Sequence, residues 1–194
     1  MITDRPTPTR GTDLQHRIKS LLFLAAMVLP AFLWAQVNYT RSTFNDTYTP
    51  ITTGGGASTA GATGDGVYTN GLPIGFNFDY NGTVYTTFGV STDGFMSFTA
   101  TGGSGTNTNL FTTSAPNAVI APWWDDLNTN AVGTNPAGSI LYQTTGAPGS
   151  QVLTVQWIVS SYWTGSGATQ PKLLNMQVKL YEATGVIELW YGDA

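Results

Sequence analysis

Residues 72–90 limit the possible folds of this chain more than any other stretch. Hydrophobic residues occupy every second position along 72–80, as in a strand that buries one face. The dipeptide Asn81-Gly82 follows at once, and residues 83–90 then resume a strand pattern. Two such segments separated by Asn-Gly indicate a β-hairpin with a type I′ turn. The sequence therefore predicts an antiparallel pair of strands over 72–90.

Short strand patterns separated by turn residues continue along the chain, and no segment after Gln36 has the pattern of an amphipathic helix. Further strands are expected over residues 95–98, 139–143, 151–159, 172–181 and 186–191, with one or two edge strands within 38–53. Loops or turns are expected over the glycine-rich residues 54–66, and over 91–94, 99–109, 128–138 and 146–150. This organisation predicts an all-β fold, an antiparallel β-sandwich of a jelly-roll or barrel-like variant.

The first 35 residues have the organisation of a secretory signal. Arg17 and Lys19 precede an apolar run over 21–35, and polar sequence starts at Gln36. The run is shorter than the roughly 20 residues of a membrane span, and Pro30 interrupts it. We therefore expect a signal helix in 1–35 and a secreted or cell-surface domain in 36–194 that does not insert into the membrane after cleavage. An uncleaved anchor or a buried helix is the alternative reading.

The last strand pattern runs almost to Ala194. This predicts that the chain is a fragment of a longer protein, whose further domains would be partners of this one.

Composition excludes several functions for residues 36–194. The bases are Arg41, Lys172 and Lys179, and acidic residues outnumber them, so that nucleic acid binding through clustered bases is excluded. The chain has no cysteine and its one histidine is His16, which removes Ser/His/Asp and Cys/His catalysis as well as His/Cys zinc sites. We therefore expect a protein that is not an enzyme.

Glycoside hydrolysis by paired carboxylates is the catalytic alternative that composition leaves open. Asp125 and Asp126 are adjacent, and neighbours on a strand point to opposite faces. Asp93 or Glu188 could complete a pair, although nothing in the spacing singles out either one.

Residues 119–127 hold two tryptophans and this acidic pair. They predict a core strand that reaches a sheet edge with its carboxylates outward, burying one of Trp123 and Trp124 and exposing the other. Oxygen-bearing side chains then alternate as in the opening of a calcium loop. The expected Ca²⁺ ligands are Asp125, Asp126, Asn128 and Asn130, and no other cofactor is expected.

The continuation of that loop departs from the calcium pattern. Ala131 stands where a turn glycine belongs, and Ala137 where a bidentate glutamate would be. A solvated loop with Asx turns is therefore the alternative reading of these residues.

Aromatic residues near strand ends are candidates for a binding surface, because exposed aromatics are enriched at interfaces. Trp157 and Trp190 lie in alternating strands and are expected in the core. The expected ligand-binding residues are Trp124, Tyr162 and Trp163. The ligand would be an extracellular protein or a glycan.

The order of six motifs is similar to that of the nidogen-like (NIDO-type) extracellular domain. The motifs cover 90–98, 119–126, 138–142, 153–157, 175–180 and 187–192. With 48–52 and 72–76, the chain resembles most closely the N-terminal modules of secreted Bacteroidetes surface proteins exported by type IX secretion. The resemblance implies extracellular adhesion, with no catalytic residues to carry over.

Taken with the composition, this predicts a secreted, non-catalytic binding or adhesion module that interacts through loops on a β-sandwich. The alternative is a carbohydrate-binding module accessory to an enzyme domain outside this sequence.

Overall fold

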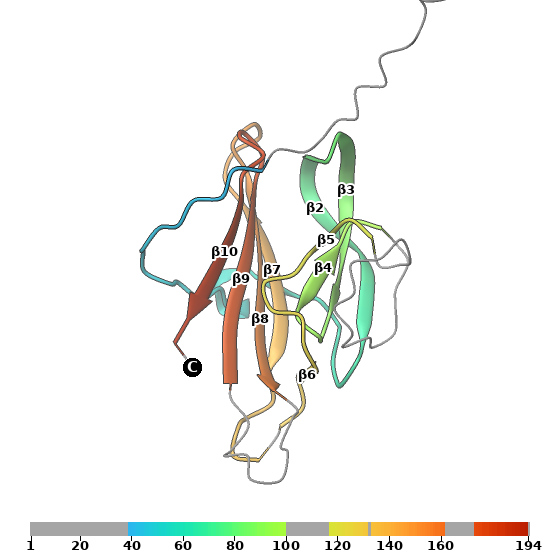
Figure 1. Ribbon diagram of the computed structural model, residues 1–194, viewed down its shortest axis with the longest axis vertical. Coiled ribbons are helices and arrows are strands. Elements are labelled where there is room, and N and C mark those ends of the chain that lie inside the picture. Colours follow the sequence, from blue (N-terminus) through green and yellow to red (C-terminus); the bar gives the residue numbers. More distant parts are fainter. Residues whose placement is uncertain (1–38, 100–116, 132, 162–172, 194) are drawn as a thin grey trace, which may run out of the picture. The chain divides into compact units, whose positions relative to one another are not determined.

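The computed structural model describes residues 39–99, 117–131, 133–161 and 173–193. The predicted signal peptide and the candidate ligand-binding residues Tyr162 and Trp163 lie outside these ranges. Within them the regular structure is β-strand, apart from one 3-10 turn, η1 (Thr53–Gly55) (Figure 1). A search of the same residues for helices long and apolar enough to cross a membrane finds none.

Two antiparallel sheets face each other, which confirms the predicted β-sandwich (Figure 1). The first sheet contains β2 (Tyr68–Tyr80), β3 (Thr83–Ser91), β4 (Phe95–Ser97) and β5 (Val119–Ile120), in that order. The second sheet contains β1 (Ser58–Thr59), β7 (Ser139–Thr145), β8 (Val152–Ser161), β9 (Leu173–Tyr181) and β10 (Ile187–Gly192), in that order, and β6 (Leu127–Asn128) pairs with the end of β8. From β2 to β5 and from β7 to β10, each strand pairs with the next in sequence, so both sheets contain a meander.

The hairpin predicted from Asn81-Gly82 is present between β2 and β3. Asn81 has φ 57° and Gly82 has φ 75°, the two positive values that a type I′ turn requires. The Gly82 N–H also donates to Asp79 Oδ1 at 2.9 Å. The turn thus sets the register of the three pairs next to it, from Phe78–Tyr85 to Tyr80–Thr83, and the register shifts further along the two strands.

The core lies between the two sheets and follows the alternation of the sequence. Leu153, Val155 and Trp157, on one face of β8, are fully buried, and Trp157 was predicted in the core. The indole Nε1–H of Trp157 donates to the Ser91 carbonyl of the first sheet at 2.9 Å. Buried residues that pack with them are Ile74, Phe78, Phe88, Val90, Met96, Met176, Val178 and Leu180. Burying a side chain of this size contributes up to about 1.5–3 kcal/mol, so this layer supplies most of the driving force for closing the sandwich.

The edge strands predicted within 38–53 are absent from residues 39–52, and that prediction was wrong. This segment instead bonds to side chains of β8 and β9. The Ile51 N–H donates to Gln156 Oε1 at 2.9 Å, and Gln177 Nε2 donates to the Thr49 carbonyl at 2.8 Å. Both glutamines are fully buried. Because their side chains satisfy the backbone of the segment, it needs no neighbouring strand.

The glycine-rich stretch 54–66, predicted as a flexible loop, is partly regular. It contains the end of η1 and the strand β1, which pairs with β7. Ala57, Ala60 and Ala62 are buried. The small side chains let the backbone pass close to β7, where the Ala60 N–H donates to the Ile140 carbonyl at 2.9 Å.

Candidate functional site

Residues 121–126 carry the chain from the first sheet to the second (Figure 1). The core strand predicted over this stretch is shorter than expected, because β5 ends at Ile120 and β6 begins only at Leu127. Pro122 has no N–H to donate to a strand ladder, which explains why pairing stops there. The acidic pair therefore lies on a crossover loop rather than on a strand.

One of the two adjacent tryptophans is buried and the other exposed, as predicted. Trp124 is 9% exposed, and its ring lies 4.6 Å, centroid to centroid, from that of Phe95. Trp123 is 49% exposed. The candidate ligand-binding residue Trp124 is thus the buried member of the pair.

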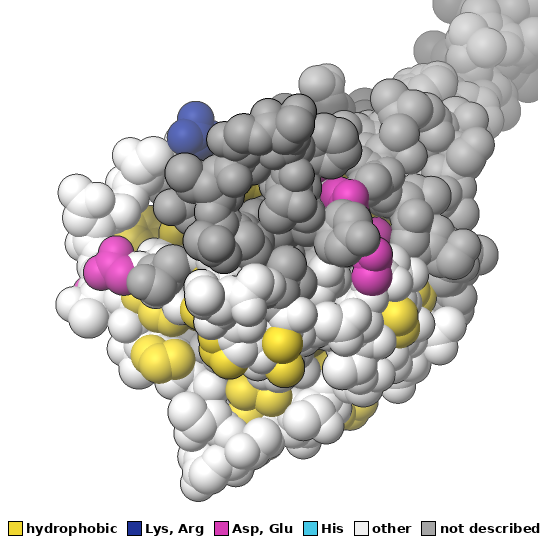
Figure 2. All heavy atoms as spheres, turned by 90° about the horizontal axis from the view of Figure 1, so that it is seen from below, with side chains coloured by type: hydrophobic (Ala, Val, Ile, Leu, Met, Phe, Trp, Pro, Cys, Tyr) yellow, Lys and Arg dark blue, Asp and Glu magenta, His cyan; other side chains and the backbone are white. Residues whose placement is uncertain are grey.

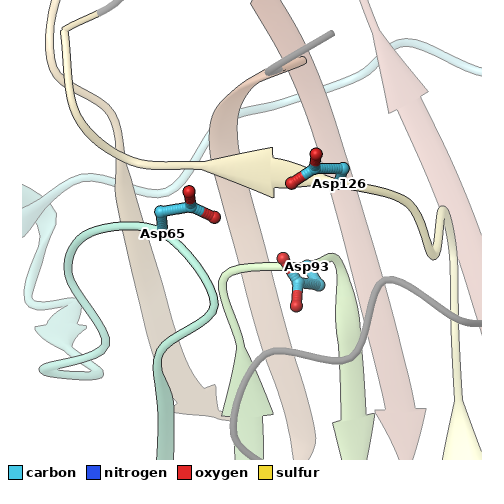
Figure 3. Close-up of side chains that lie close together, drawn as sticks. All are labelled: Asp65, Asp93 and Asp126. Atoms are coloured by element: carbon cyan, nitrogen blue, oxygen red, sulfur yellow. The ribbon is translucent and has the colours of Figure 1, made fainter.

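Three aspartates from separate loops come together beside this crossover (Figure 3). Asp65 precedes β2, Asp93 lies in the turn between β3 and β4, and Asp126 precedes β6. One carboxylate oxygen from each lies within 4.8 Å of the other two. Asp65 is exposed, Asp126 is half-buried and Asp93 is only 1% exposed. We call these three residues the aspartate cluster.

Backbone hydrogen bonds hold the three loops of the cluster in place. The turn between β3 and β4 bonds to both of the other loops, and the loop before β2 also bonds to the chain just after β6. The three bonds run from Asp125 N–H to the Asp93 carbonyl at 3.3 Å, from Thr92 N–H to the Val67 carbonyl at 2.9 Å, and from Thr129 N–H to the Gly64 carbonyl at 3.0 Å. The carboxylates cannot separate by loop movement unless these bonds break.

Asp93 has the least favourable environment of the three. Burial raises the pKa of Asp93 to about 6; a hydrogen bond from the backbone N–H of Leu127 acts in the opposite direction, and Asp65, Asp126 and Asp125 raise it further. Its Oδ2 atom is buried without a hydrogen-bond partner among the described residues. A buried polar atom without a partner destabilises the folded state, and more so when it carries charge. The arrangement therefore favours a positive species, a proton or a metal ion, next to Asp93.

The calcium ligands predicted from the sequence are only partly brought together. Of the four, Asp126 belongs to the aspartate cluster. Asp125 is exposed, and its Oδ1 accepts the Asp126 N–H at 2.8 Å. Asn128 is buried, and its Oδ1 accepts the Asn130 N–H at 2.8 Å, which is the Asx turn of the alternative reading. Asp65 and Asp93 were not predicted as metal ligands, because only the folded chain brings them beside Asp126.

The end of the sandwich that carries these loops is seen in Figure 2, where acidic side chains gather at one side of the view. Two packed antiparallel sheets with loop carboxylates at one end define the class of this domain, a β-sandwich module.

Comparison with known proteins agrees with this class. The sequence model of the family described as NIDO related matches residues 38–194, which is most of the chain. The chain therefore belongs to the nidogen-related family, as its motif order had indicated. Domains of this family are typically extracellular and of a non-catalytic type. Neither the curated proteins nor the solved structures contain a match to the chain.

Proposed function

We propose that this domain is a secreted, non-catalytic adhesion module of a bacterial surface protein, and that it binds an extracellular protein. The family of the chain supports an extracellular role. The order of its motifs supports an origin among Bacteroidetes surface proteins of the type IX secretion route. The observation that carries the proposal is a group of exposed apolar side chains where β10 meets the crossover loop.

This apolar surface consists of Trp123, Leu189 and Tyr191, which are 49%, 39% and 57% exposed. The Tyr191 hydroxyl donates to the Pro122 carbonyl at 2.8 Å, so that the tyrosine lies beside the loop that carries Trp123. Leu189 lies opposite the fully buried Val178 across the pair of β9 and β10 and so shares its face of the sheet. It is nevertheless exposed, because β10 pairs on one side only within the described residues.

The chemistry of this surface favours a protein over a sugar as the partner. Tryptophan and tyrosine are enriched among the residues that dominate protein–protein binding energy. Sugar sites need directional polar groups beside the aromatic rings, whereas the β10 neighbours that share this face with Tyr191 are Leu189 and Ile187. The edge of β10 that pairs with no strand in the described part of the chain also offers backbone groups to an extended segment of a partner.

A glycosidase function has little support. Its two carboxyl groups must flank a sugar, and they lie about 5–9 Å apart in such enzymes. The aspartate cluster is tighter, within 4.8 Å, and Asp93 is 1% exposed, out of reach of a substrate.

The proposal can be tested with beads coated with the full chain and incubated with intact cultured cells. Bead adhesion is compared among the wild type, Trp123→Ala, Leu189→Ser and the control Val84→Ser, whose valine is 58% exposed on β3 of the other sheet. We expect Trp123→Ala to reduce binding at least about tenfold and the control to leave it unchanged.

Treating the cells beforehand identifies the class of partner. Protease treatment should abolish adhesion, and periodate oxidation of glycans should not. Loss of adhesion after periodate alone would instead support the carbohydrate-binding alternative. Adhesion that survives both substitutions in the apolar surface would contradict the proposed binding surface.

A further inference from the structure

We propose that Asp65, Asp93 and Asp126 together bind one Ca²⁺ ion, which ties together the three loops that carry them (Figure 3). This inference does not depend on the proposed adhesion function or on its partner.

The spacing of the carboxylates fits a calcium ion. Ligand oxygens lie about 2.3–2.6 Å from Ca²⁺, so two oxygens on opposite sides of the ion are about 4.6–5.2 Å apart. One carboxylate oxygen from each aspartate of the cluster lies within 4.8 Å of the other two, so that one ion can contact all three residues. Carboxylates are hard oxygen ligands, which Ca²⁺ prefers, and the exposed side of Asp65 leaves room for water to complete the coordination.

The burial of Asp93 is an independent observation that points to a bound cation here. Its carboxyl group points toward those of Asp65 and Asp126 (Figure 3) and is 1% exposed. Its Oδ2 atom has no hydrogen-bond partner in the part of the chain that the structure describes. Almost all buried polar groups in native proteins are satisfied, so an unsatisfied oxygen on a buried carboxylate that faces two more carboxylates points to a cation-binding site.

The surrounding structure explains why the carboxylates do not simply move apart. Hydrogen bonds between the loops fix the backbone on each side of the aspartate cluster. Asp65 also forms an isolated antiparallel bridge with Asn128 of β6. Asp93 belongs to the first sheet and β6 to the second, so an ion shared by the cluster links the two sheets at this end. The same ion would hold the crossover loop that carries Trp123.

The test is a calorimetric titration of the full chain with CaCl₂ after the protein has been freed of metal by a chelator. We expect one site with a dissociation constant of about 10⁻⁵–10⁻³ M, the range of sensor and extracellular sites. Asp93→Asn and Asp65→Asn should each weaken binding at least about tenfold, because each removes a charged ligand. Asp125→Asn is the matched control, since it removes the same charge from the loop that carries Asp126 but outside the cluster, and it should change the affinity less than about threefold.

Several results would overturn the proposal. One is that the protein does not bind Ca²⁺ at about 10 mM, and another is that Asp93→Asn and Asp65→Asn both leave the affinity unchanged. A third is that Asp125→Asn lowers the affinity as much as they do, which would mean that Ca²⁺ binds diffusely to an acidic surface. Binding of MgCl₂ with the same affinity would overturn the assignment to Ca²⁺. Circular dichroism checks the fold of each variant, and Asp65→Asn, whose side chain is exposed, decides the result if Asp93→Asn does not fold.

Discussion

Asp93→Asn should stabilise the metal-free protein and reduce the stabilisation that calcium gives it. In the folded chain, the Asp93 carboxyl is buried with an unpartnered oxygen close to two other carboxylates. An asparagine keeps the acceptor for the Leu127 N–H and replaces the second oxygen by an NH₂ donor. That donor would face the carboxylates of Asp65 and Asp126, so that repulsion becomes attraction.

The size of the effect follows from the pKa of Asp93, which burial raises from 3.8 to about 6. A shift of about two units corresponds to roughly 3 kcal/mol at 1.36 kcal/mol per unit, the cost of keeping Asp93 ionised in the folded state at pH 7.5. We expect the variant to regain about 1–3 kcal/mol, or about 2–10 °C in melting temperature for a domain of this size.

The pH dependence has a defined sign. The folded wild-type protein binds the Asp93 proton more tightly than the unfolded chain does. The stability that this proton contributes is fully present below pH 3.8 and is lost as pH rises through about 6. The difference between the variant and the wild type should therefore disappear at acid pH.

Calcium should stabilise the wild type more than Asp93→Asn, which is opposite to the difference expected in chelator. At a Ca²⁺ concentration ten times the dissociation constant, the wild type gains about 1.4 kcal/mol and the variant much less. The assay is thermal unfolding followed by circular dichroism, with a chelator and with Ca²⁺, and with Asp125→Asn as the charge control. A variant that is no more stable than the wild type in chelator at pH 7.5 would refute this reasoning about Asp93.

Three further predictions concern the scaffold. Gln156→Ala should lower the free energy of unfolding in urea by about 2–4 kcal/mol, because it leaves the partly buried backbone N–H and C=O of Ile51 unsatisfied. Gln143→Ala, which removes one exposed hydrogen bond, is the control and should cost under about 1 kcal/mol. Gly94→Ala should prevent stable folding, as judged by circular dichroism, because the added Cβ would lie 1.9 Å from a backbone carbonyl oxygen. Gly82→Ala is the control: Gly82 has a similar φ but open space around it, so the substitution should cost only about 1 kcal/mol. Burial, followed by the hydrogen bond and the charge of Glu188, raises the pKa of Tyr181 to about 12, so ultraviolet titration should show a tyrosine that ionises late. The stability that protonated Tyr181 contributes should persist below pH 10 and be lost as pH rises toward 12.

The strands were predictable because their information is local. The alternation over residues 72–80 and the Asn81-Gly82 turn specify a hairpin without help from the rest of the chain, and Trp157 of β8 is buried as predicted. The Thr and aromatic residues before Thr53 carry a similar pattern but form no strand. What decides their structure is a pair of glutamines on β8 and β9, far away in the sequence.

The candidate site was harder to predict for a related reason. Asp126 was recognisable because it stands in a local pattern of oxygen-bearing residues. Asp65 and Asp93 reach it only when the loop before β2 and the turn after β3 are hydrogen-bonded into place. Such proximity depends on the closed sandwich, and no spacing within one segment encodes it. Asp93 itself sits in a turn, Ser91-Thr-Asp-Gly94, that was predicted correctly for its shape but not for its burial.

The most direct test of the calcium site is a crystal structure of the domain grown with millimolar CaCl₂. We expect one ion bound by carboxylate oxygens of Asp65, Asp93 and Asp126 at about 2.3–2.6 Å, with Asp93 Oδ2 no longer without a partner. Ordered carboxylates with no ion among them, or an ion held by Asp125 and Asn130 instead, would contradict it.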